Sequence, residues 1–238
     1  MISSPMTTPN MPETDITSDP KKTYTAAIIR WVVVAGMILA GIIVYPHLPD
    51  RIPTHWGIHG EVNGWSNRWP GAFIAPIMGI IFLILFPFLQ RIDPKRRNYG
   101  NFQQAWEGIQ TLLVLFFAYI QGVTYVATLR QVDSNFVGQS IMVGIGILFI
   151  VLGNYMGKVR QNWFVGIRTP WALEDPVVWQ KTQRIGGWAF VIGGIAILLM
   201  SLTMPPNPYI FMGIIAVIAL GPIVYSYVIA KKMGVMKK

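Results

Sequence analysis

The chain has 238 residues, of which 53% are hydrophobic and only 12% are charged, with a mean hydropathy of +0.48. Soluble domains do not combine so many apolar residues with so few charges, so most of the chain is expected to lie in lipid. Because there is no cysteine, disulfides, thiolate metal sites and cysteine nucleophiles are excluded. The net charge of +9 follows the ends of the apolar segments, a pattern that indicates membrane topology, and no nucleic-acid partner is predicted.

Residues 1–22 are rich in Ser, Thr and Pro and poor in apolar side chains, which predicts a disordered cytoplasmic tail. Beyond this tail, six apolar segments have about the 20 residues that a helix needs to cross a bilayer. They run from Ala26 to Tyr45, Gly71 to Leu89, Ile109 to Leu129, Val137 to Met156, Ile185 to Met204 and Tyr209 to Ala230. The predicted fold class is an all-α integral membrane protein with six transmembrane helices.

The distribution of Lys and Arg predicts how these spans are oriented. If the N-terminus is cytoplasmic, sixteen of the 19 basic residues lie on the cytoplasmic side. The three on the outer side are Arg51, Arg68 and Arg130. Because cytoplasmic segments are enriched in Lys and Arg, both termini are expected inside, in a multi-pass protein of the cell membrane.

The first three spans form a predicted N-terminal membrane domain, 23–130, whose outer loop at 46–70 holds all three histidines: His47, His55 and His59. The i, i+4 spacing of the last two would suit metal on a helix, but nearby proline and glycines oppose a helix. A zinc site needs three or four converging ligands, so His55 and His59 are only weak metal candidates and no cofactor is predicted. Histidine pH sensing stays open as an alternative.

The favoured structure for this loop is a compact fold at the outer membrane surface. In it, Trp56, Trp65 and Trp69 pack together, and His55 is hydrogen-bonded to the backbone. The residues that we select as functional candidates in this outer loop are His55, Trp56, Gly60, Glu61 and Trp65.

Polar residues within the spans are few, and no acidic residue lies in the middle of a predicted span. Transport coupled to protons or sodium usually needs such groups at membrane depth, so a pump is disfavoured. Gln121, Thr124 and Thr128 share one face of the third span, and interhelical hydrogen bonds explain them better than a substrate path. Close helix packing is predicted at Gly36, Gly41, Gly144, Gly146, Gly193 and Gly194.

The last three spans form a predicted second membrane domain, 131–238, with a cytoplasmic elbow at 157–184. One interpretation is an anchor in which Arg and Trp bind anionic headgroups, which the composition alone explains. The other is a docking surface, or a polar cluster closing the inner mouth of the bundle, built from Asn162, Arg168, Thr169 and Glu174. Our candidates here are Asn154, Asn162, Gly166, Arg168, Thr169, Pro170, Trp179, Thr182 and Arg184.

The local structure of the elbow can be predicted from its prolines. Pro170 disfavours helical geometry at Thr169, so "GIRTP" should be extended or turned. Asp175 and Pro176 should form the N-cap and first residue of a helix that continues into the fifth span. Four tryptophans favour a place at the membrane interface: Trp163, Trp171, Trp179 and Trp188.

The elbow motifs "GNYMGK", "QNWFVGIRTPWAL" and "VVWQKTQRIGG" resemble the signature of the SdpI family of bacterial membrane proteins. The outer-loop motif "IPTHWGIHGEVNGW", followed by a basic residue and an apolar span, resembles the uncharacterised domain that commonly precedes that signature. Finding both motifs in one six-span chain is more specific than finding either alone. The chain departs at Gln183, where the family often has His, and at Asn63, where it often has Asp.

This resemblance implies a polytopic immunity protein without enzymatic activity. The family's named member protects a toxin-producing bacterium from its own secreted peptide and holds a transcriptional repressor at the membrane when toxin is present. We therefore expect immunity to, or sensing of, a secreted antimicrobial peptide. The expected partners are the lipid bilayer, a peptide toxin outside and a cytoplasmic repressor inside. A small-molecule transporter or exporter, or a membrane enzyme using the outer histidines and Glu61, remains an alternative.

Overall fold

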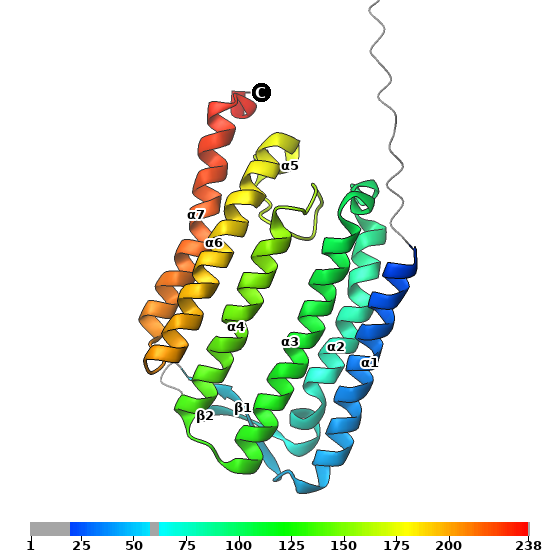
Figure 1. Ribbon diagram of the computed structural model, residues 1–238, viewed down its shortest axis with the longest axis vertical. Helices are drawn as coiled ribbons and strands as arrows, with labels where there is room; N and C mark the ends of the chain where they lie inside the picture. The colour runs from blue at the N-terminus through cyan, green and yellow to red at the C-terminus, as the bar shows by residue number, and fades with distance from the viewer. Residues whose placement is uncertain (1–19, 58–61, 238) are drawn as a thin grey trace, which may run out of the picture.

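The computed structural model describes residues 20–57 and 62–237 and shows a bundle of long helices (Figure 1). Its elements are α1 (Pro20–Val44), the 3-10 helix η1 (Tyr45–His47), β1 (Arg51–Trp56), β2 (Val62–Asn67), α2 (Arg68–Ile92), the 3-10 helix η2 (Arg96–Phe102), α3 (Gln103–Arg130), α4 (Ser134–Met156), α5 (Pro170–Glu174), α6 (Pro176–Thr203), α7 (Pro208–Lys232) and the 3-10 helix η3 (Val235–Lys237).

Six of these helices, α1, α2, α3, α4, α6 and α7, are long and apolar enough to cross a membrane. Each coincides with one predicted span to within one residue at the C-terminal end or contains it, so the predicted six-span, all-α membrane protein is confirmed. Their outward faces leave large apolar side chains uncovered, such as Ile84 at 63% and Val217 at 69% exposed. Faces of this kind need lipid around them. Helix α1 begins at Pro20, inside the expected tail, and residues 1–19 lie outside the described part.

Polar caps start the helices of the second half of the chain, as predicted for α6. The Asp175 carboxylate accepts hydrogen bonds from the backbone N–H groups of Val177 (2.7 Å) and Val178 (2.8 Å), and Pro176 is the first helical residue. Since the first N–H groups of a helix have no partner within it, such a cap stabilises the helix start. Helix α6 then runs unbroken from the elbow to Thr203.

Glycines bring α4 and α6 into backbone contact. A Cβ on Gly153 would lie 2.6 Å from the Gly187 carbonyl oxygen, and one on Gly194 would lie 2.7 Å from the Gly146 carbonyl oxygen. Only a residue without a side chain fits at these points. Close packing is therefore confirmed for Gly146 and Gly194, but the prediction for Gly36 is wrong, because nothing lies within 4 Å of a Cβ built there.

Gln121 joins the three helices of the first half. Its Nε2 donates to the Met37 carbonyl on α1 (2.9 Å) and to the Tyr125 hydroxyl (2.6 Å), which in turn donates to the Ala72 carbonyl on α2 (2.7 Å). The predicted interhelical bonding is confirmed for Gln121. It is wrong for Thr124 and Thr128, whose hydroxyls donate to carbonyls one turn earlier in α3.

The two ends of the bundle differ in character (Figure 1). One end, which we call the basic end, carries the start of α1, the C-terminal helix η3, η2, α5 and the elbow. The opposite end, the hairpin end, carries β1 and β2 and the α3–α4 and α6–α7 turns. A buried cluster at the basic end joins both halves of the chain: Phe86, Tyr99, Phe102, Ala105, Trp106, Ile109, Val159, Ala172, Val178, Trp179 and Ala230.

Candidate functional site

The loop 46–70 contains a two-stranded antiparallel hairpin, an element that the sequence did not predict. Arg51 pairs with Asn67 and Ile52 with Ser66, and the register is irregular beyond Pro53. Ile52 is fully buried against Gly71, where a Cβ would lie only 2.9 Å from the Ile52 Cβ. This contact fixes the base of the hairpin to the start of α2.

His55 pairs across the hairpin with the side chain of Asn63, through the ring Nδ1 and the amide Oδ1. The predicted backbone partner is therefore wrong. The opposite position is Gly64, whose missing side chain leaves room for His55, because a Cβ there would lie 2.6 Å from the His55 Cβ. The uncharged residue at Asn63, one of the two departures from the family pattern, thus has a defined role here.

The tryptophans of this loop are predicted to pack together at the outer interface. Trp65 is 56% exposed and Trp69 is 57% exposed, and the Trp69 ring centroid lies 5.7 Å from that of Phe73, so a large part of both side chains is open to lipid or to a ligand at the hairpin end. His59, Gly60 and Glu61 lie outside the described residues, and so does the side chain of Trp56. Among the residues described, no three His, Asp or Glu side chains gather to hold a metal ion.

At the basic end, the first part of the elbow is a coil that Asn162 organises. Its Oδ1 accepts from the backbone N–H groups of Phe164 (2.9 Å) and Val165 (2.7 Å). Its Nδ2 donates to the carbonyls of Arg160 and Val165, both at 2.9 Å. Asn162 is fully buried, so all of its hydrogen-bonding capacity serves the turn.

Gln183 on α6 clamps the next residues of the coil. Its Oε1 accepts from the Ile167 N–H (3.1 Å) and its Nε2 donates to the Ile167 carbonyl (3.0 Å), which satisfies both backbone groups of one residue. Gly166 lies against this amide with a φ of +108°, a backbone conformation that favours glycine. We named Gly166 as a candidate from sequence but missed its partner Gln183.

The elbow then crosses to α7 through Ser226. The Thr169 hydroxyl and Ser226 hydroxyl are 2.7 Å apart, and the Trp171 Nε1 donates to Ser226 at 2.6 Å. Thr169 is extended, as predicted, and caps the short helix α5 that begins at Pro170. Trp179 was predicted to lie at the membrane interface, but it is buried within the protein at 2% exposed. Its Nε1 donates to the Val159 carbonyl (2.9 Å).

The other elbow candidates do not form the polar cluster that was one of the interpretations open for this segment. Arg168 donates to the Trp163 carbonyl (2.6 Å), and Glu174 and Arg184 are exposed. Asn154 bonds to the Ile150 carbonyl one turn earlier in its own helix (3.1 Å). The Thr182 hydroxyl is buried without a hydrogen-bond partner among the described residues. Among those residues, no hydrogen bond or ion pair joins Asn162, Arg168, Thr169 and Glu174 to one another.

Asp93, which the sequence reading passed over, ties the elbow to the first half of the chain. Its carboxylate is buried, at 2% exposed, and accepts from the Trp163 N–H (2.9 Å), the Tyr99 hydroxyl (2.9 Å) and the Lys95 N–H (2.7 Å). In the sequence, the feature that could have drawn attention to Asp93 is its position as a single acidic residue between the basic residues Arg91 and Lys95. Charge-assisted bonds to buried donors are the stronger kind, so Asp93 latches the elbow onto the α2–α3 connection.

Lys95 and Gln161 extend this latch. The Lys95 Nζ donates to the Gln161 Oε1 (2.5 Å) and to the Leu173 carbonyl (2.8 Å). The Gln161 Nε2 donates to the Ala172 and Leu173 carbonyls at 2.8 and 2.9 Å. Burial lowers the pKa of Lys95, and the nearby Asp93 charge opposes this shift. A single network therefore joins the α2–α3 connection, the coil and α5.

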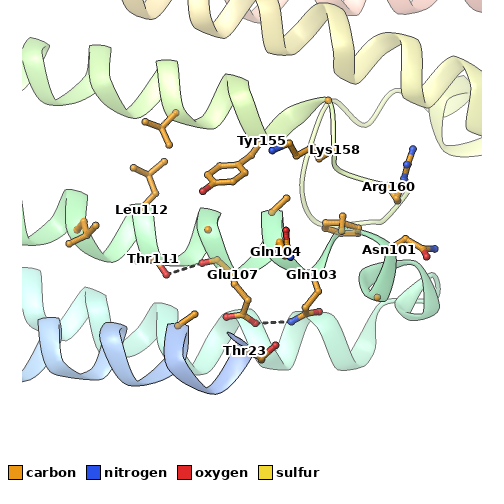
Figure 2. Close-up of a pocket in the computed structure, with 18 residues that line it drawn as sticks. Thr23, Asn101, Gln103, Gln104, Glu107, Thr111, Leu112, Tyr155, Lys158 and Arg160 are labelled. Atoms are coloured by element: carbon orange, nitrogen blue, oxygen red, sulfur yellow. Dashed lines mark hydrogen bonds between the residues drawn. The ribbon is translucent and has the colours of Figure 1, made fainter. Parts of the chain in front are cut away.

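A second unforeseen feature is an ion pair between α1 and α3. The Arg30 Nη1 lies 2.5 Å from the Glu107 Oε2, with side chains that are 6% and 13% exposed. Gln103 also donates to Glu107 (2.7 Å), as Figure 2 shows. Arg30 is one of the sixteen basic residues predicted on the cytoplasmic side, and in the structure it is buried within the bundle. Glu107 lies inside a helix that is long enough to span the membrane, beyond the boundary predicted for the third span.

The described polar side chains at the two ends form hydrogen bonds chiefly with backbone groups and with each other. Their arrangement is therefore suited to binding and to holding segments of the chain in place. The hairpin end presents exposed aromatic rings beside a His–Asn pair, and the basic end presents a fixed elbow that contacts α2, α3, α6 and α7. Both ends carry the motifs that the sequence singled out.

Two regions of the chain are similar to known protein families, and they coincide with the hairpin and with the elbow. Residues 32–80, which contain the hairpin, match a domain of unknown function, DUF1648. Residues 158–226, which run from the start of the elbow to the Ser226 that holds it, match the SdpI/YfhL protein family. The second half of the chain is thus similar to the SdpI/YfhL protein family over residues 158–226. The resemblance predicted from the sequence is thereby confirmed.

One relative extends the similarity over most of the chain. The chain is 28% identical to the protein named "Immunity protein SdpI" of Bacillus subtilis (strain 168), over 182 residues. The alignment covers 73% of this chain and 80% of that protein. No solved structure matches. The similarity to this protein thus extends well beyond the region that matches the SdpI/YfhL family.

The Gln183 clamp can be tested by replacing its amide. Gln183→Leu leaves both backbone groups of Ile167 without partners, so we expect a loss of about 1–3 kcal/mol in the free energy of unfolding. Gln183→Glu keeps the acceptor but buries a carboxylate without a cation and turns an oxygen toward the Ile167 carbonyl, so it should cost at least as much. Unfolding of the purified protein in detergent, with proteolysis of the elbow as a second readout, measures this. Gln180→Leu, at an exposed position one turn earlier, is the control and should stay within about 0.5 kcal/mol of wild type; equal losses would refute the clamp.

Proposed function

We propose that this chain is a non-enzymatic immunity protein that protects the cell membrane against a secreted antimicrobial peptide. The observation that carries the proposal is the alignment with the Bacillus subtilis immunity protein, which covers 80% of that protein. The alignment covers 73% of this chain, which itself has six helices long and apolar enough to cross a membrane. The basic end faces the cytoplasm in this proposal, because 15 of the 18 basic residues outside the buried Arg30 were assigned to that side.

The geometry supports different roles for the two ends of the bundle. Toxin meets the hairpin end, where Trp65 and Trp69 are exposed and His55 is held in place by Asn63. Aromatic rings of this kind supply contact area to an amphipathic peptide. The fixed elbow at the basic end supports the sensing part of the proposal, in which Arg168, Arg184 and their neighbours present a surface to a cytoplasmic repressor.

The acidic groups also favour protection over coupled transport. Glu107 is the acid that lies inside a candidate span away from its ends, and Arg30 neutralises it. Pumps usually need ionisable groups whose charge can change at membrane depth, and a paired acid is poorly suited to that.

Gene deletion tests the proposed immunity. We expect the deletion strain to become several-fold more sensitive to a membrane-active peptide that the host itself makes, with protection restored by the wild-type gene. Trp65→Ala should restore only part of the protection, whereas Tyr24→Ala, which changes an exposed aromatic residue at the basic end, should restore all of it. Unchanged sensitivity to every peptide of the host's own making would contradict the proposal.

A further inference from the structure

A cavity of about 930 Å³ lies between α1, α3 and α4 at the basic end. Figure 2 shows Tyr155 reaching from α4 toward α3 within it, with Lys158 and Arg160 on the segment that follows α4. Tyr155 can take this position because Gly108 has no side chain; a Cβ there would lie 2.5 Å from the Tyr155 hydroxyl oxygen. A volume of this size is in the range of binding sites for small organic ligands.

The lining of this cavity changes from polar to apolar along α3. Near the basic end it is formed by Asn101 and Gln104, and deeper in the bilayer by Leu112, Leu115 and, from α4, Val151. At roughly 1.5 Å per residue, Gln104 and Leu115 are about 16 Å apart along the helix axis. Leu115 is 47% exposed, so the apolar part opens to the surrounding lipid. The cavity is therefore shaped for an amphiphile lying parallel to α3.

The charges at the polar mouth favour an anion. Lys158 and Arg160 are both exposed, and neither forms an ion pair with any residue that the structure describes. The Lys158 Nζ lies over the Tyr155 ring, 5.7 Å from its centroid, which directs the ammonium group to the cavity. Glu107 does not cancel these charges, since Arg30 already pairs with it. Lys158 and Arg160, which have no ion-pair partner among the described residues, thus lie at the polar mouth of the cavity, next to its apolar part.

We propose that this cavity binds one anionic phospholipid, with its phosphate between Lys158 and Arg160 and an acyl chain between α3 and α4 along Leu112 and Leu115. Charge complementarity selects the lipid, because each cation near a membrane surface attracts an anionic headgroup. A second copy of the chain is a poorer occupant, because the positive charges of its own basic end would be repelled by Lys158 and Arg160 at the mouth of the cavity. This site is independent of the proposed immunity function, and it gives the membrane a direct contact with the start of the elbow.

Native mass spectrometry of the full chain tests the site. The protein is incubated with mixed micelles of phosphatidylglycerol and phosphatidylethanolamine, and the retained lipid is identified. We expect one phosphatidylglycerol per chain, retained in preference to phosphatidylethanolamine. The variant Lys158→Ala/Arg160→Ala should lose this preference about tenfold or more, as expected when two such cations are removed.

Two matched variants make the result decisive. Lys231→Ala/Lys232→Ala removes the same charge at the basic end, outside the cavity, and should retain the lipid. Leu115→Trp fills the apolar part without changing charge and should weaken retention. An equal loss in the Lys231/Lys232 variant would overturn the proposal in favour of a general basic surface. Retention that is unaffected by Leu115→Trp, but displaced by inorganic phosphate, would overturn the assignment to a lipid.

Discussion

Asp93→Ala is expected to lower the free energy of unfolding by about 3–5 kcal/mol, because it leaves the buried Tyr99 hydroxyl and Trp163 N–H without an acceptor. Each orphaned buried donor costs about 1–3 kcal/mol, and the loss of the bond to the Lys95 N–H adds to this. Because Asp93 holds the elbow to the α2–α3 connection, the elbow should also become open to proteases. Unfolding in detergent and limited proteolysis together measure the two effects.

Asp133 provides the matched control for this experiment. It is an exposed aspartate whose side chain accepts from the Phe136 N–H at the start of α4 (2.8 Å). Asp133→Ala should cost about 1 kcal/mol, the usual value of a lost N-cap, and should leave the elbow protected. If the two variants lose equal stability, or if the elbow of Asp93→Ala resists protease as wild type does, Asp93 is not a latch.

Breaking the Arg30–Glu107 pair is expected to be similarly costly. Arg30→Met or Glu107→Leu alone strands a buried charge, which typically costs about 3–5 kcal/mol. The double variant removes both charges, so it should be more stable than either single variant. The free energies of unfolding of wild type, both single variants and the double variant form a cycle that gives the coupling energy.

The pair at the hairpin end, Arg68 and Asp50, has the same chemistry without the burial. Its Nη2 and Oδ1 atoms are 2.6 Å apart, but the Asp50 side chain is 95% exposed. A cycle on this pair should give a coupling of about 1 kcal/mol or less, since water screens it. A coupling for Arg30 and Glu107 that is no larger would show that lipid and protein do not exclude water from that pair.

The six spans were predictable because crossing a bilayer imposes a length and a composition that any single segment must meet. The cap at Asp175 was predictable for a similar reason: an Asp–Pro pair acts on its own neighbours. The hairpin was not, since its strands are short and contain Pro53 and Gly64, which obscure the alternation that marks a strand.

The candidate site was predicted in part. Asn162, Gly166 and Thr169 were selected from the elbow and each has a defined structural role, but their partners were not predicted. Gln183 bonds to a residue 16 positions away, and Asp93 to one 70 positions away. A single sequence carries no signal for such pairs, because nothing local marks a buried amide or carboxylate as the partner of a distant backbone group.

What the sequence by itself determined is the medium and the course of the chain: six helices in lipid, the cap of α6 at Asp175, and motifs at two ends. These depend on the transfer of each segment from water to lipid and on local backbone geometry, which neighbouring residues decide. The tertiary structure decided which polar groups meet. The Asp93 latch, the Arg30–Glu107 pair and the cavity above Leu115 all depend on how helices from different parts of the chain pack, because a buried polar group is stable only where the fold brings it a partner.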